Sequence, residues 1–195
     1  YGLDALRYYL LKEVSFGNDG NISKAKLISC INSDLANNFG NLCQRVLTFV
    51  EKNLSLMVPK PEAFTKEDLN LLNNFSNNHR YLKECIDNQN INSYMNFIVD
   101  QMFSANKYFN DQEPWKKKDD IKRLNTIIYT ALELIRKISI LLYPVMPDSS
   151  LKALNIFSIY EKSLQFDSIK DNEFLKPNFK LKKIDILFHK VFIDD

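Results

Sequence analysis

The sequence predicts an all-α protein: an antiparallel helix bundle with an extended C-terminal tail. Only four glycines occur, and three of them precede residue 21, so little of the chain is suited to tight turns. Apolar residues recur three and four positions apart in successive segments, which is the period of amphipathic helices. Prolines and short polar links separate these segments, and no internal repeat is present.

The first half of the chain predicts two helices. Residues 3–14 carry apolar side chains at helical spacing, and a turn is expected at residues 16–20. Ser23 is suited to cap a second, longer helix over residues 24–52, because its hydroxyl can accept from a backbone N–H of the first turn. The expected buried stripe of that helix comprises Leu27, Ile31, Leu35, Leu42, Val46 and Phe49.

Further helices are expected over residues 66–87, 91–108 and 121–142. The link at residues 88–90 is so short that the helices on either side of it should be antiparallel neighbours. Prolines end the last of these helices, after which Asp148 is expected to cap a short helix through Leu154. The chain beyond residue 160 is mixed in pattern, and residues 181–192 read as either a strand or an extended arm.

Composition restricts the class of protein. The chain of 195 residues is 45% hydrophobic and 26% charged, as in ordinary globular proteins, and no apolar run approaches the roughly 20 residues that span a bilayer, so we expect no membrane partner. Three widely spaced cysteines indicate reduced thiols in a cytosolic protein, and with only two histidines a zinc site is not expected. Because the sequence opens on Tyr1 rather than Met, we expect a segment of a longer protein.

Asn41 and Arg45 form the first candidate binding pair. They are four residues apart on one predicted helix, so both side chains leave the same strip of its surface. An amide can read the edge of an unpaired base, and a guanidinium can bond a base or stack on it. The competing interpretation is an ordinary solvated polar face.

Trp115 is the second candidate. It is the only tryptophan, Pro114 stiffens the chain before it, and Lys116, Lys117 and Lys118 follow. An exposed indole offers a stacking surface for a base, and the lysines are candidates for phosphate contacts. The alternative is a tryptophan in the core followed by a solvated helix start. No catalytic constellation, P-loop or Gly-rich dinucleotide motif is present, so we expect no chemistry within this segment.

Five segments resemble the C-terminal part of the methionyl-tRNA synthetases, a family of class I aminoacyl-tRNA synthetases. DALRYYLL alone is common to several class I families, whereas the FGNDG turn, INSDLANNFGNLCQR and EPW together are specific to the methionine family. The segments cover residues 1–23 (YGLDALRYYLLKEVSFGNDGNIS), 31–45 (INSDLANNFGNLCQR), 113–115 (EPW), 141–150 (LLYPVMPDSS) and 187–191 (LFHKV).

The resemblance implies an anticodon-binding helix bundle. Residues 1–22 would be the remnant of the junction after the catalytic half, residues 23–157 the bundle, and residues 158–195 a tail packing back on the bundle or the junction. Asn41 and Arg45 match the residues that contact the CAU anticodon, and Trp115, presented by Pro114, matches the one on which a base stacks. The implied partners are the anticodon stem-loop of tRNA(Met) and the protein's own catalytic domain.

The resemblance also limits what this segment can do. It lacks the HIGH-type and KMSKS motifs, so no cofactor is expected here, whereas the parent enzyme would use ATP and Mg²⁺ and could hold Zn²⁺ in its catalytic half. Glu113 departs from the small residue often found before Pro-Trp, and it places a negative charge beside the expected RNA site. Two alternatives stay open: an anticodon-binding domain of another class I synthetase, and a helical protein-interaction module.

Overall fold

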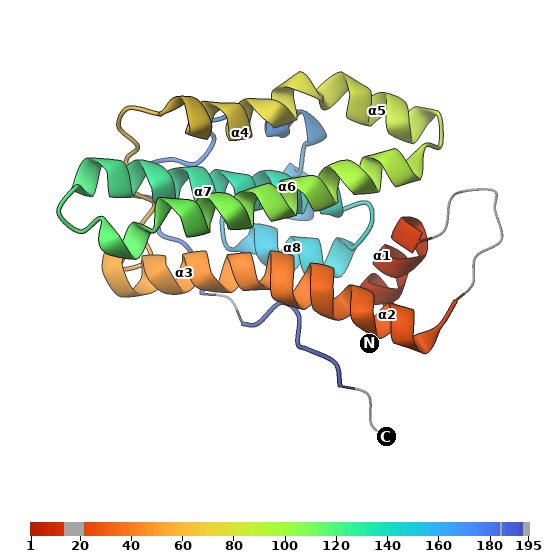
Figure 1. Ribbon diagram of the computed structural model, residues 1–195. Helices are drawn as coiled ribbons and strands as arrows, with labels where there is room; N and C mark the ends of the chain where they lie inside the picture. Colours follow the sequence, from red (N-terminus) through yellow and green to blue (C-terminus); the bar gives the residue numbers. More distant parts are fainter. Residues whose placement is uncertain (14–21, 184, 193–195) are drawn as a thin grey trace.

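The computed structural model describes residues 1–13, 22–183 and 185–192, and it is an all-α bundle (Figure 1). The expected turn at residues 16–20 lies outside the described residues. Within them, no helix combines the length and the apolar character that crossing a bilayer requires. The α-helices are α1 (Leu3–Glu13), α2 (Lys24–Cys30), α3 (Asn41–Leu54), α4 (Lys66–Asn77), α5 (His79–Asp87), α6 (Ile91–Gln112), α7 (Ile121–Leu142) and α8 (Pro147–Asn155).

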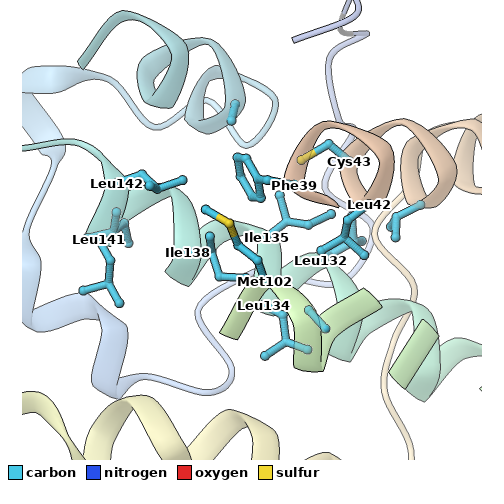
Figure 2. Close-up of a cluster of buried hydrophobic side chains, with 14 of the residues drawn as sticks. Phe39, Leu42, Cys43, Met102, Leu132, Leu134, Ile135, Ile138, Leu141 and Leu142 are labelled. Carbon is cyan, nitrogen blue, oxygen red and sulfur yellow. The ribbon is translucent and has the colours of Figure 1, made fainter. Parts of the chain in front are cut away.

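Helix α7 is the centre of the bundle. It contacts α3, α4, α6 and α8, and nearly all of its side chains beyond the first turn are buried. Figure 2 shows Ile135 and Ile138 of α7 packed with Met102 of α6 and with Phe39 and Leu42 from the long N-terminal helical run. Burying such side chains contributes about 1.5–3 kcal/mol each relative to exposure, so this cluster dominates the stability of the bundle.

The predicted helix over residues 24–52 is one continuous helical run, but its middle is not α-helical. Between α2 and α3 the chain forms a π-helix, η1 (Ile31–Gly40). The wider turn of a π-helix changes which side chains face inward, and Asp34 is buried there rather than lying on the polar strip with Arg45. Asp34 accepts hydrogen bonds from Lys12 Nζ at 2.6 Å and from the Tyr8 hydroxyl at 3.1 Å, which fastens α1 to η1.

The single helix predicted over residues 66–87 is wrong, because the chain breaks there into α4 and α5. The backbone of Asn78 departs from helical geometry, with φ −98° and ψ 2°. Its side-chain Nδ2 donates to the carbonyl oxygen of Asn74 at 2.9 Å and so competes with the backbone ladder. Neither glycine nor proline marks this position in the sequence.

The other helix ends differ from prediction in detail. Ser23 caps α2 as expected, accepting from the backbone N–H of Lys26 at 3.1 Å. Helix α6 continues to Gln112, four residues beyond its expected end at Tyr108. Asp148 does not cap α8: the N-cap is Met146, and Asp148 lies in the first turn of the helix.

As far as its residues are described, the C-terminal segment covers the bundle without forming a sheet. Short 3-10 turns occur at η3 (Glu161–Ser163) and η4 (Phe166–Lys170), and one isolated antiparallel bridge joins Met57 to Lys180. Further along, the side chain of Asn32 in η1 forms two hydrogen bonds with the backbone of Val191. Its Nδ2 donates to the Val191 carbonyl oxygen at 2.8 Å, and its Oδ1 accepts from the Val191 N–H at 2.8 Å. The described part of the tail is therefore an extended arm.

This tail also covers a group of buried charges on α7. Glu133 and Arg136 pair at 2.7 Å with no exposed surface, and the backbone N–H of Leu175 donates to Glu133 Oε1 at 2.7 Å. Lys137 donates to the carbonyl oxygen of Ile169 and to Oδ1 of Asn172 at 2.8 Å. The charges are buried because tail backbone groups provide their partners, which an amphipathic pattern does not reveal.

Candidate nucleic-acid interface

Arg45, Phe109 and Trp115 meet where α3 passes the connection between α6 and α7. The guanidinium carbon of Arg45 lies 5.2 Å from the ring centroid of Phe109 and 5.6 Å from that of Trp115. The two rings pack edge to face, with centroids 6.0 Å apart. Phe109 is buried, whereas 40% of Trp115 is exposed, so the indole forms part of the surface of this cluster.

A hydrogen bond fixes the Arg45 side chain in this position. Its Nη1 donates to Oδ1 of Asn110 at 2.7 Å, linking α3 to the end of α6 across 65 positions of sequence. The guanidinium retains further N–H donors after this bond, and a planar group held against aromatic rings is well suited to bidentate hydrogen bonding.

The conformation of the turn that carries Trp115 is set by its backbone angles and backbone hydrogen bonds. Glu113 adopts a left-handed conformation (φ 42°) that ends α6, and the buried Pro114 begins the 3-10 turn η2 (Pro114–Lys116). The N–H of Lys116 donates to the Glu113 carbonyl at 2.8 Å, and that of Lys117 donates to the Pro114 carbonyl at 3.1 Å. The turn thus begins at a buried proline of fixed φ, and Trp115 follows it directly with its indole partly exposed.

A polar network supports the end of α6 immediately before this turn. Arg123 Nη2 donates to Gln112 Oε1 at 2.7 Å and to Oδ1 of the fully buried Asp68 at 2.9 Å. The Tyr108 hydroxyl donates to the same carboxylate at 2.6 Å. Burial alone raises the pKa of Asp68, but the hydrogen bonds from Arg123 and Tyr108 outweigh it, and the pKa lies below its ordinary value. The carboxylate is therefore ionised at neutral pH and holds Arg123 in place.

The cluster borders a pocket of about 460 Å³. Among the described residues that line it, aromatic and cationic side chains are joined by amides and a hydroxyl, and none is acidic. Aromatic faces beside positive charge and neutral hydrogen-bonding groups are typical of sites for unpaired nucleotides. The lining residues are Gln44, Arg45, Thr48, Phe49, Lys52, Asn53, Phe109 and Trp115.

The structure brings some of the sequence-predicted residues together and leaves others apart. Arg45 and Trp115 share the pocket, whereas Asn41 is exposed one turn earlier on α3 and does not line it. Lys116 pairs with Glu113 at 2.7 Å, so the unusual acidic residue is neutralised by the first of the three lysines. Lys117 is half-buried and Lys118 is exposed.

Sequence analysis missed Phe109 and Asn110, which hold Arg45 in place. Both lie in a segment that reads as ordinary amphipathic helix, and their partner is more than 60 positions away. These contacts join α3 to the C-terminal end of α6, and no local spacing in the sequence indicates them.

Comparison with known families divides the chain into two matched regions. Residues 58–195 match a family described as the anticodon binding domain of methionyl tRNA ligase. Residues 1–47 match the family of class I tRNA synthetases for methionine.

Curated relatives match over most or all of the chain. A methionine–tRNA ligase from Mycobacterium leprae is 38% identical over 174 residues, covering 87% of this chain and 32% of the relative. The ligase from Caldanaerobacter subterraneus is 37% identical and that from Thermotoga maritima 33% identical, each covering 100% of this chain and 31% of the relative. The chain thus spans about a third of the length of these relatives.

Solved structures give the same result. The crystal structure of apo Mycobacterium tuberculosis methionyl-tRNA synthetase superimposes with a TM-score of 0.91 at 33% identity, covering 99% of this chain and 40% of that one. A structure of the M. tuberculosis enzyme in complex with methionyl-adenylate gives 0.89 at 34% identity, covering 96% and 37%. On the family match over residues 58–195, together with these relatives, the chain belongs to the family of anticodon-binding domains of methionyl-tRNA ligase.

Proposed function

We propose that the pocket between α3 and the turn Pro114–Lys116 binds the CAU anticodon loop of tRNA(Met). The observation that carries the proposal is the meeting of Arg45 with the partly exposed ring of Trp115 at one open pocket. A solvent-accessible indole beside a fixed guanidinium offers a base both a stacking face and hydrogen-bond donors. A helical protein-interaction module has no need of that combination.

Each sequence-predicted residue has a role in this proposal. One anticodon base stacks on Trp115, which Pro114 presents, while Arg45 and Asn41 bond base edges from successive turns of α3. A wrong base leaves a polar group of the site unpaired, at a cost of about 1–3 kcal/mol. Phosphate contacts, which add affinity without sequence choice, come from Lys116, Lys117 and Lys118.

We extend the proposal to a protein of the length of these relatives, of which this chain would form about a third. In that protein a catalytic half would activate methionine with ATP and Mg²⁺ and would charge the tRNA in the cytoplasm. That half would also hold Zn²⁺. Residues 1–22 would form the junction to that half, residues 23–157 the anticodon-binding bundle, and residues 158–195 the tail. The match of residues 1–47 to the class I synthetases for methionine supports this order along the chain.

The test is a titration of the 195-residue chain with anticodon stem-loops. Trp115 is the only tryptophan, so its fluorescence reports directly on the proposed site. A stem-loop with CAU should bind about 5- to 150-fold more tightly than one with a single changed anticodon base at the same salt concentration, which corresponds to about 1–3 kcal/mol. Equal affinities for the two RNAs would contradict the proposal.

A further inference from the structure

The pocket extends well beyond the residues assigned to anticodon recognition. From Arg45 it continues along α3 past Thr48 and Phe49 to Lys52 and Asn53. Arg45 and Asn53 are eight residues apart, which is about 12 Å along the axis at a rise of about 1.5 Å per residue. One base stacked on Trp115 beside Arg45 therefore leaves the far end of the pocket unfilled.

Phe49 and Asn53 give this far end the character of a base site. Phe49 is half-buried, so part of its ring remains in contact with the pocket. The Asn53 Nδ2 donates to the carbonyl oxygen of Phe49 at 2.9 Å, which fixes the amide and leaves Oδ1 to accept a hydrogen bond from a ligand. An aromatic surface beside an oriented acceptor is suited to the face and the N–H edge of a base.

Lys52 adds positive charge to the same end. It is exposed, it lines the pocket, and none of the ion pairs among the described residues engages it. The neighbouring carboxylate of Glu51 is paired with Lys183 and does not neutralise it. An ammonium in this position can contact the phosphate of a nucleotide whose base lies over Phe49.

We propose that Phe49, Lys52 and Asn53 form a second nucleotide subsite, which binds a loop nucleotide next to the one stacked on Trp115. The base lies over Phe49 with an N–H donating to Asn53 Oδ1, and Lys52 contacts its phosphate. This inference rests on the proposed function, since it needs the RNA strand to enter the pocket at Trp115. It adds a contact that Asn41, Arg45 and Trp115 do not supply.

The phosphate contact is tested by the salt dependence of CAU stem-loop binding. Replacing Lys52 with glutamine should reduce the slope of log affinity against log salt by about 0.7, the value for one phosphate contact on a single strand. Lys26→Gln is the matched control, because Lys26 is an exposed lysine on α2, at the other end of the same helical run. Lys26→Gln should leave the slope unchanged, and a Lys52→Gln slope equal to that of the wild type would overturn the proposal.

The base contact is tested by a double-mutant cycle between protein and RNA. Abasic substitution at each loop position identifies the base in the second subsite, whose removal should weaken wild-type binding about 5- to 150-fold. At that loop position alone, removing the base should reduce the affinity of Asn53→Ala clearly less than that of the wild type. The reason is that the variant already lacks the hydrogen bond between Asn53 Oδ1 and the edge of the base. If no loop position other than the one on Trp115 couples to Asn53, the subsite does not exist. If the protein prefers the CAU stem-loop but no second loop position couples to Asn53, the second subsite is refuted and the proposed function stands. If the protein does not prefer the CAU stem-loop, the proposed function itself is refuted.

Discussion

Replacing Trp115 with alanine should weaken RNA binding while the bundle stays folded. The indole is 40% exposed and contributes an edge-to-face contact with Phe109, worth about 0.5–1.5 kcal/mol, and a contact with the Arg45 guanidinium, worth about 0.5–1 kcal/mol. Truncating a fully buried Trp to Ala costs about 3–5 kcal/mol including such contacts, and because 40% of this indole is exposed the expected loss of stability is about 2–3 kcal/mol, or about 4–12 °C in Tm for a chain of this size. Losing one stacked base costs about 1–3 kcal/mol of binding, so Kd should rise about 5- to 150-fold.

The assay is fluorescence anisotropy of a labelled CAU stem-loop, since the variant no longer contains tryptophan, alongside thermal unfolding followed by circular dichroism. Phe103→Ala is the matched control: Phe103 is an exposed aromatic residue on α6 that does not line the pocket, and its loss should leave Kd unchanged. Trp115→Phe should retain part of the affinity, because phenylalanine still offers a stacking face. Unchanged binding by Trp115→Ala, or a loss of stability above about 5 kcal/mol, would show that the indole is a structural residue and not a stacking surface.

Three further predictions concern charge and packing. Glu113→Gln should free Lys116 for phosphate and tighten stem-loop binding by up to about fivefold at low salt, as measured by titration. Burial and the nearby Arg136 lower the pKa of Lys137 to about 7, so only the unfolded chain is protonated there between about pH 7 and its ordinary pKa of 10.5. The free energy of unfolding of the wild type, measured with urea, should therefore rise with pH across this window relative to that of Lys137→Met. The expected rise is up to about 1.4 kcal/mol per pH unit. Gly40→Ala should lose about 1–3 kcal/mol in the same measurement, because a Cβ there would lie 2.8 Å from a backbone oxygen of η1.

Two of these predictions have a control variant within the chain. For Glu113→Gln, the Lys116→Gln, Glu113→Gln double variant should lose the gain, and a persistent gain would show that the ion pair is not its cause. For Lys137→Met, a stability difference from wild type that does not change between pH 7 and 9 would mean that the buried amine keeps its ordinary pKa. For Gly40→Ala, the exposed Asn37→Ala in the same π-helix should have little effect, and equal stability of both variants would remove the steric argument.

The helices that the sequence predicts well are those with strong apolar periodicity and clear punctuation. The helix over residues 121–142 has the same ends in the structure, because Asp120 caps it and prolines follow it. The break at Asn78 was missed because a side chain that bonds back to its own helix leaves no trace in composition. The π-helix was missed for a similar reason: the apolar pattern continues through it.

The residues of the candidate site also fall into those that the sequence predicts and those that it does not. Arg45 and Trp115 are conspicuous residue types in specific local motifs, so sequence alone identifies them. Lys52 and Asn53 follow Arg45 by seven and eight residues on α3, so helical spacing places them on the same strip as Arg45. Phe109 joins the pocket only because Arg45 meets the end of α6, and the sequence contains no local signal of that contact. The charges of α7 likewise look solvent-exposed until the tail is seen to cover them.

The two hydrogen bonds between Asn32 and Val191 join positions 159 residues apart. On the ribosome, η1 therefore emerges long before the segment that covers it, and the two can meet only after nearly all of the bundle has been synthesised. Closing so large a loop is slow compared with forming a local helix. Nascent chains should thus expose Asn32 until the last stage of folding, when the arm fastens the early and late parts of the polypeptide together.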